Sequence, residues 1–143
     1  EHGCEFIINY KEEKVFNKVM EITNNQGVPV VYDGVGKDTF DESIKCLSTR
    51  GLMVSFGQSS GMVEKIDMHK TFNPKSLFYT RPSLMGYTLN REELINCSNK
   101  VFDKMKKGDV KANIYKKFKL NQAEQAHKTL QSRKSSGSII LEP

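Results

Sequence analysis

Two apolar runs constrain the fold of this chain more than any other feature. "VPVVY" (28–32) and "LMVSF" (52–56) lack the regular polar alternation of a strand with one face in water. Each run ends in glycine and small polar residues, "DGVG" after the first and "GQSSG" after the second. Such runs are typical of strands in the middle of a parallel sheet whose faces are covered by helices.

The segments around these runs carry the periodicity of helices and further strands. Apolar residues recur at helical spacing in 11–27 and again in 38–51, each closed by a glycine. "FIINY" (6–10) and "SLFYTRPSL" (76–84) are rich in β-forming residues and predict two more strands, the second closed by Pro82. The resulting alternation predicts an α/β fold with a parallel sheet and helices on both faces.

The last third of the chain has a different organisation. An amphipathic helix is predicted over 91–108, with Gly108 as its stop. "NIYKKFKL" (113–120) and "SIILEP" (138–143) predict strands, and the segment between them predicts a helix. Asn121 is the expected N-cap of that helix, with Glu124 at capping-box spacing. The chain therefore ends in a strand–helix–strand segment.

The polar ends of the strands are the candidate binding residues. In open α/β sheets, ligands bind in the crevice beyond the carboxyl ends of the strands. Gly57, Gln58 and Ser59 stand at such an end, and 33–36 is the equivalent end of the preceding strand. Glycine lets a ligand approach the backbone, while Gln and Ser supply hydrogen-bond donors and acceptors.

Two further side chains have alternative interpretations. Tyr10 ends the first predicted strand, so it either points at the same crevice or serves as an amphipathic packing residue. Arg133 lies at a helix end, where it either complements the helix dipole or clamps a phosphate. The residues alone leave both alternatives open.

Composition and motifs argue against several classes of function. The net charge is +5, and the lysines of 104–119 are interpreted as an exposed helix end and strand rather than a nucleic-acid site. No apolar run approaches the roughly 20 residues of a membrane helix. "GVGKDT" (34–39) does not match the phosphate-loop pattern, and no G-x-G-x-x-G occurs.

Neither the cysteines nor the histidines predict a metal site. Cys4, Cys46 and Cys97 are dispersed and form no C-x-x-C pair, so we expect reduced thiols in a cytoplasmic protein. The three histidines have no metal-binding spacing, and we predict that no metal is bound. The amino-terminal stretch lacks an initiator Met and signal-peptide features.

Several motifs together resemble one family over essentially the whole chain. "INYKEE", "VVYDGVGKDTFDESIKCLSTRGLMVSFGQSSG", "SLFYTRPSL", "REEL" and "AHKTLQSRKSSGSIILEP" are similar to the C-terminal half of NADPH:quinone oxidoreductases. These are the zinc-free, zeta-crystallin-like branch of the medium-chain dehydrogenases/reductases. The resemblance implies hydride transfer from NADPH to a quinone or a related electrophilic carbonyl compound, in which the cofactor carries the chemistry.

The resemblance also implies which residues contact NADPH. Tyr10 and Arg133 correspond to residues at the adenosine ribose phosphate, and Val35 to one lining the crevice. The others correspond to two strand ends along the cofactor: Phe56, Gly57, Gln58, Ser59, Pro82, Ser83 and Leu84. The family often has Asn where Gln58 stands. No catalytic residue follows from the resemblance.

The resemblance implies a fragment of a larger enzyme. The chain is expected to be the second half of a doubly wound Rossmann sheet, with 1–110 as a partial cofactor-binding domain that lacks its first two strands. Residues 111–143 would return to a substrate domain that is not in this sequence. We expect such a fragment to be inactive by itself and to bind NADPH weakly, because the glycine-rich turn that holds the pyrophosphate is missing.

Three alternatives to a quinone reductase fragment remain. Relatives dimerise through an edge strand, so we expect a homodimer through Ser76–Leu84, and the piece could act only as a dimerising or nucleotide-binding module. Another zinc-free reductase, acting on enones or enoyl thioesters, is the enzymatic alternative. Nucleic-acid binding through the lysine-rich stretch is the weakest of the three.

Overall fold

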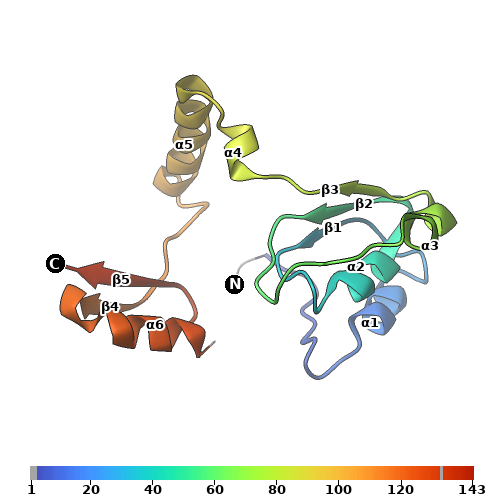
Figure 1. Cartoon of the computed structure of the whole chain (residues 1–143), viewed down its shortest axis with the longest axis horizontal. Coiled ribbons are helices and arrows are strands. Elements are labelled where there is room, and N and C mark those ends of the chain that lie inside the picture. Colours follow the sequence, from blue (N-terminus) through green and yellow to red (C-terminus); the bar gives the residue numbers. More distant parts are fainter. Residues whose placement is uncertain (1–2, 133) are drawn as a thin grey trace. The chain divides into compact units, whose positions relative to one another are not determined.

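The computed structural model describes residues 3–132 and 134–143, which form two compact units (Figure 1). The first unit extends to Tyr87 and the second begins at Thr88. The boundary predicted at residue 110 refers to the two domains of the family's whole chains, and it stays a prediction. Each unit is described separately below.

The first unit is built on a three-stranded parallel sheet. Strands β1 (Val28–Asp33), β2 (Leu47–Ser55) and β3 (Phe78–Thr80) lie in the order β1-β2-β3. Helices α1 (Val15–Ile22) and α2 (Phe40–Cys46) lie together on one side of this sheet, where α2 packs on β1 and β2 (Figure 1). The parallel α/β fold predicted from the sequence is confirmed. Helices on the other face of the sheet stay a prediction.

The rest of the first unit connects β2 to β3 and leads out of the sheet. Helix α3 (Met68–Phe72) runs directly into a 3-10 turn, η1 (Asn73–Lys75), and α4 (Leu84–Tyr87) follows β3. The Lys75 ammonium donates hydrogen bonds to the backbone carbonyls of Lys45 and Leu47, at 2.8 and 2.5 Å. This lysine therefore ties the connection to the end of α2 and the start of β2.

The hydrophobic core lies between the sheet and the helices that cover it. Tyr79 on β3 sets its ring edge-on against Phe40 and Phe72, with centroids 6.3 and 5.8 Å apart. Partly buried side chains from the strands and loops complete the cluster. Its buried members are Phe40, Leu47, Met53 and Phe72.

One face of β1 is open, contrary to the prediction of a strand covered on both faces. Val30 is 38% exposed and Tyr32 is 72% exposed, whereas Val31 packs against the core and Asp33 is buried. These residues alternate because successive side chains of a strand point to opposite faces. Within the described residues β1 is an edge strand, and β2 is the central strand of the sheet.

The strand predicted over Phe6–Tyr10 does not form. This segment is irregular and ends in a turn, in which the Asn9 carbonyl accepts hydrogen bonds from the amides of Glu12 and Glu13 at 2.9 Å. A strand exists only by pairing, and no described segment pairs with this one. The β-rich composition therefore gave a wrong prediction here.

Helix α2 is shorter than predicted. It ends at Cys46, not at Gly51, because Leu47 already pairs with Val28 and is completely buried as the first residue of β2. The pairing register then shifts before Leu52, and Arg50 adopts a positive φ of 59°. A tight kink in the strand thus occupies the residues that were expected to finish the helix.

The second unit contains the predicted strand–helix–strand segment. Helix α5 (Arg91–Lys106) is followed by β4 (Ile114–Lys119), a 3-10 turn η2 (Leu120–Gln122), helix α6 (Ala123–Gln131) and β5 (Ser138–Glu142). Strands β4 and β5 pair in parallel, and α6 forms the crossover between them (Figure 1). Phe118 and Ala126 are the buried hydrophobic residues of this unit.

The helix starts of the second unit differ in their capping. Asn90 caps α5: its side-chain oxygen accepts a hydrogen bond from the Glu93 amide at 2.9 Å. In turn, the Glu93 carboxylate accepts a hydrogen bond from the Asn90 amide. Asn121, the predicted cap of the last helix, lies inside η2, and Gln122 precedes α6 without a side-chain cap.

Among residues 3–132 and 134–143, no helix has the length and apolar composition that crossing a bilayer requires.

Candidate functional site

The carboxyl end of β1 is organised by one buried carboxylate. Asp33 is 5% exposed, and its Oδ1 accepts from the amides of Val35 and Gly36 at 2.8 and 3.0 Å. The hydroxyls of Thr39 and Ser43 donate to the same carboxylate at 2.8 to 3.0 Å. Asp33 therefore fixes the "DGVG" turn to the start of α2.

The hydrogen bonds keep this carboxylate ionised. Burial pushes the pKa of Asp33 upward, but donation from Gly36, Ser43, Val35 and Thr39 outweighs it and lowers the pKa below its ordinary value. A carboxylate that accepts several hydrogen bonds is stabilised in its charged form. The sequence pattern marks Asp33 only as the end of the strand, and this role was not predicted. Its signal was an acidic residue followed by G-x-G and hydroxyl side chains.

The ends of β1 and β2 are joined by close backbone contacts. The Asp33 carbonyl accepts from the Phe56 amide at 2.9 Å, and a Cβ on Gly57 would lie 2.8 Å from the Gly34 Cα. The Ser60 amide and hydroxyl both donate to the Val35 carbonyl, at 2.9 and 2.8 Å. Glycine is required at this approach because no side chain fits between the two backbones.

These contacts bring five predicted residues into one structure, which we call the rim: Val35, Phe56, Gly57, Gln58 and Ser59. The Phe56 side chain is 59% exposed, and Gln58 and Ser59 are exposed as well. Polar side chains of the rim are therefore available to a ligand. Whether they contact a cofactor stays a prediction.

The end of β3 reaches the rim through an arginine. The Arg81 guanidinium donates to the Gln58 side-chain oxygen at 2.6 Å and lies 3.5 Å from the hydroxyl of Ser55. The three residues predicted at this strand end follow Arg81 directly: Pro82, Ser83 and Leu84. Leu84 is 77% exposed. Arg81 was not among the predicted site residues, although it lies inside the "TRPSL" motif.

A small pocket of about 110 Å³ lies beside this contact. Its walls come from the ends of all three strands and from the loop after β2. The lining residues are Gly36, Ser55, Gly57, Gln58, Met62, Val63, Tyr79 and Arg81. The rim is therefore hollowed on the side facing β3.

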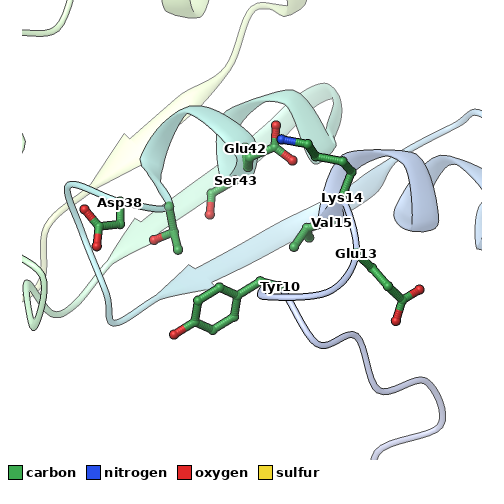
Figure 2. A pocket seen from close by; sticks show the side chains of 8 residues that line it. Tyr10, Glu13, Lys14, Val15, Asp38, Glu42 and Ser43 are labelled. Carbon is green, nitrogen blue, oxygen red and sulfur yellow. The ribbon is translucent and has the colours of Figure 1, made fainter. Parts of the chain in front are cut away.

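A second pocket, of about 270 Å³, contains the predicted residue Tyr10 (Figure 2). Tyr10 reaches it from the segment before α1, Asp38 from the turn before α2, and Ser43 from α2 itself. Glu42 also lines the pocket, and its carboxylate accepts from the Phe16 amide at 3.2 Å. The turn after β1 thus has the rim on one side and Tyr10 in a pocket at the start of α2. Arg133, the other residue predicted at the ribose phosphate, lies outside the described residues.

The absence of a bound metal stays a prediction, and the structure adds the state of the three cysteines. None of Cys4, Cys46 and Cys97, all within the described part of the chain, forms a disulfide. Burial raises the pKa of the Cys46 thiol, with the nearby Glu42 charge acting in the same direction. Among the described residues no group of three or more His, Cys, Asp or Glu side chains could hold a metal ion.

Comparisons with known proteins agree with this architecture. The family model described as zinc-binding dehydrogenase matches residues 2–141. Quinone oxidoreductase 1 of Escherichia coli (strain K12) is 45% identical over 99% of this chain, which covers 44% of that protein. The 2-haloacrylate reductase of Burkholderia sp is 40% identical over 99% of this chain and 43% of its own.

A solved structure is similar throughout. The crystal structure of Escherichia coli quinone oxidoreductase complexed with NADPH has a TM-score of 0.92 and 44% identity, covering 99% of this chain and 44% of that chain. The present chain thus spans less than half the length of the curated relatives it matches.

The resemblance first noted in the sequence motifs is confirmed, because the family model matches nearly every residue and the similarity extends to the fold. This chain belongs to the zinc-binding dehydrogenase family, as a relative of its quinone oxidoreductases.

Proposed function

We propose that the protein carrying this sequence is an NADPH-dependent reductase that transfers a hydride to a quinone or a related electrophilic carbonyl compound. The observation that carries the proposal is the rim, in which the ends of β1 and β2 are joined at the edge where α/β sheets bind ligands. The NADPH complex of the Escherichia coli relative supports the choice of cofactor. NADPH supplies the hydride, while the protein's residues bind and orient it.

The cofactor contacts are proposed residue by residue. We infer that Val35 and the other rim residues lie along NADPH, with Phe56, Gly57, Gln58 and Ser59 beside its nicotinamide half. Pro82, Ser83 and Leu84 extend this surface from β3, and Tyr10 and Arg133 hold the adenosine ribose phosphate. No residue is assigned as a catalytic acid or base.

The enzymatic proposal is tested on the natural protein in its full length. With NADPH and a quinone, we expect the absorbance of NADPH to fall with time and a hydroquinone to form. We expect NADH to be used more slowly, because it lacks the 2′-phosphate that Arg133 is proposed to bind. Equal rates with the two cofactors would contradict the role of Arg133, and no reduction of any electrophile would contradict the function.

A second candidate substrate class is an activated alkene. The 2-haloacrylate reductase of Burkholderia sp, whose name specifies such a substrate, is 40% identical to this chain. The alkene differs from a quinone in receiving the hydride at a carbon conjugated to a carboxylate. A competition between 2-chloroacrylate and a quinone in the same assay distinguishes the two classes by their kcat/KM values.

We expect the 143-residue chain alone to bind NADPH weakly and to be inactive. The pyrophosphate of a dinucleotide is normally held by a glycine-rich turn and a helix N-terminus, and this sequence contains no G-x-G-x-x-G. Calorimetric titration with NADPH measures the affinity, with the full-length protein as the reference. Binding in the sub-micromolar range by the 143-residue chain would contradict this expectation.

We further propose a homodimer through the edge strand within Ser76–Leu84. Supporting it, β3 is one of the two edge strands of the sheet that the described residues form, all three of its residues are exposed, and Phe78 is 62% exposed. An unpaired edge with an apolar side chain favours pairing with another copy. Sedimentation should show dimers, and Phe78→Lys should shift them to monomers; a monomer at high concentration without the substitution would contradict the proposal.

We also propose a cytoplasmic location for this protein. It is consistent with three dispersed cysteines that form no disulfide.

A purely structural dimerising module is the non-enzymatic alternative to the reductase. It predicts dimers without any NADPH oxidation by the full-length protein.

A further inference from the structure

The contact between Arg81 and Gln58 is the least explained feature of the rim. It links the end of β3 to the loop after β2, across 23 residues of sequence, at 2.6 Å. Both side chains are exposed, so neither is needed to fill the core. No carboxylate partner of Arg81 is recorded in the part of the chain that the structure describes. The guanidinium of Arg81 thus donates to an uncharged amide, where a carboxylate would be the stronger partner.

The backbone of Gln58 is already fixed without Arg81. Its carbonyl accepts from the Gly61 amide at 2.9 Å. Gly36, with a φ of 92°, approaches so closely that a Cβ there would lie 3.0 Å from the Gln58 Cα. What remains mobile is the side chain, because a glutamine has three rotatable bonds and two orientations of its amide.

Arg81 removes that freedom. A guanidinium offers only donors, so the group it meets on Gln58 must be the carbonyl oxygen. The amide nitrogen of Gln58 is then directed to other partners, and the described residues provide no recorded hydrogen bond to it. An exposed, oriented N–H donor is thus left on the rim.

We propose that Arg81 is a positioning residue that orients the Gln58 carboxamide so that its nitrogen donates to a carbonyl oxygen of the bound ligand. The inference rests on the proposed function, because the rim is where the nicotinamide half of NADPH is expected. The acceptor is either the carboxamide of the nicotinamide or the carbonyl of the substrate. Preorganising a flexible donor in this way strengthens binding by up to about tenfold, because the side chain loses less freedom when the ligand arrives.

The pair also accounts for the length of the side chain at this position. Glutamine is longer than asparagine by one methylene group. The extra length adds a rotatable bond, which Arg81 restrains through its contact with the amide oxygen. Gln58 and Arg81 therefore form one functional unit, and substitutions of the two should not be additive.

The first test does not depend on NADPH. In the 143-residue chain, NMR relaxation of the Gln58 side-chain amide is measured with and without Arg81→Met, and a Gln58→Ala sample assigns the signal. We expect the amide to be ordered in the unsubstituted chain and mobile in Arg81→Met, while Arg91→Met on α5 leaves it unchanged. An amide that is equally ordered after Arg81→Met overturns the proposal.

The second test separates orientation from general stability in the full-length protein. Arg81→Met should raise the KM of the ligand that accepts the hydrogen bond by about fivefold or more, with Arg81→Lys closer to the unsubstituted protein. Gln58→Glu keeps the contact with Arg81 but removes the N–H donor, so we expect an unchanged Tm and the same loss of binding. A merely structural pair predicts the opposite, namely that Gln58→Glu is harmless.

The two KM values identify the acceptor. A rise confined to the KM for NADPH assigns the nicotinamide carboxamide, and a rise confined to the quinone assigns the substrate carbonyl. If Gln58→Glu changes neither KM nor kcat, the proposal is wrong. If the unsubstituted protein oxidises no NADPH, the proposed function fails, and the NMR experiment still decides whether Arg81 orients Gln58.

Discussion

Replacing Asp33 by alanine is expected to lower the free energy of unfolding by about 3–5 kcal/mol, because several hydrogen-bond donors lose their shared acceptor. The carboxylate accepts from two backbone amides and from the hydroxyls of Thr39 and Ser43. In Asp33→Ala the buried amide of Gly36 and three partly buried donors lose their acceptor. An unsatisfied buried group costs about 1–3 kcal/mol, and the partly buried donors cost less because water can replace the acceptor. Since small domains are stable by only about 5–15 kcal/mol, this loss is a large part of the stability of the first unit.

Urea denaturation of the 143-residue chain, followed by circular dichroism, measures this effect. Asp41→Ala is the matched control, because Asp41 is exposed in the first turn of α2. Its loss should cost less than about 1 kcal/mol through the helix dipole. An Asp33→Ala chain whose unfolding free energy lies as close to the parent as that of Asp41→Ala would show that the network does not stabilise the fold.

The same carboxylate gives the stability a defined pH dependence. The pKa of Asp33 is lower in the folded chain than its ordinary value of 3.8, despite the opposing effect of burial. Its contribution is therefore fully present above the unfolded-state pKa and is lost as the pH falls through the lower, folded-state pKa. Below about pH 4, Asp33→Asn should lose less stability than the parent chain, because it has no proton to take up at this position.

Local patterns predicted those elements whose stabilising contacts are near in sequence or follow a strong period. The apolar run before Asp33 and the one before Gly57 became neighbouring parallel strands. Helix α5 formed as its amphipathic pattern predicted, and α6 formed within the segment expected to be helical between the last two strands. The polar strand ends could also be predicted, because parallel strands place their carboxyl ends on one edge of the sheet.

Structural elements and contacts that depend on a partner distant in sequence could not be predicted from local composition. Phe6–Tyr10 has the residues of a strand, but no described segment pairs with it. The end of α2 at Cys46 is decided by the pairing of Leu47 with Val28, 19 positions earlier in the chain. The contact between Arg81 and Gln58 likewise joins two strand ends that only the fold brings together. In each case a tertiary partner outweighs the local propensity.

Gly57→Ala is expected to lower the free energy of unfolding strongly as well, and it tests whether the ends of β1 and β2 lie as close together as the rim requires. A Cβ at Gly57 would lie 2.8 Å from the Gly34 Cα and even closer to the Gly34 carbonyl oxygen. Both contacts are to backbone, which moves only if the ends of β1 and β2 separate. Overpacking of this kind typically costs about 1–3 kcal/mol, and the rigidity of the partner argues for the upper end of that range.

Two other glycines provide matched controls that separate backbone collision from the loss of glycine as such. At Gly34 a Cβ would meet the exposed ring of Phe56, 2.9 Å away, and a side chain can rotate aside. At Gly86 in α4 nothing lies within 4 Å, and alanine favours a helix. Unfolding free energies should therefore fall most for Gly57→Ala, less for Gly34→Ala, and remain equal or rise for Gly86→Ala. In the full-length protein, Gly57→Ala should weaken NADPH binding at least tenfold, because separating the strand ends by a fraction of an ångström displaces the oriented groups of the rim. Equal stability of the three variants would mean that the strand ends are not held as closely as their hydrogen bonds indicate.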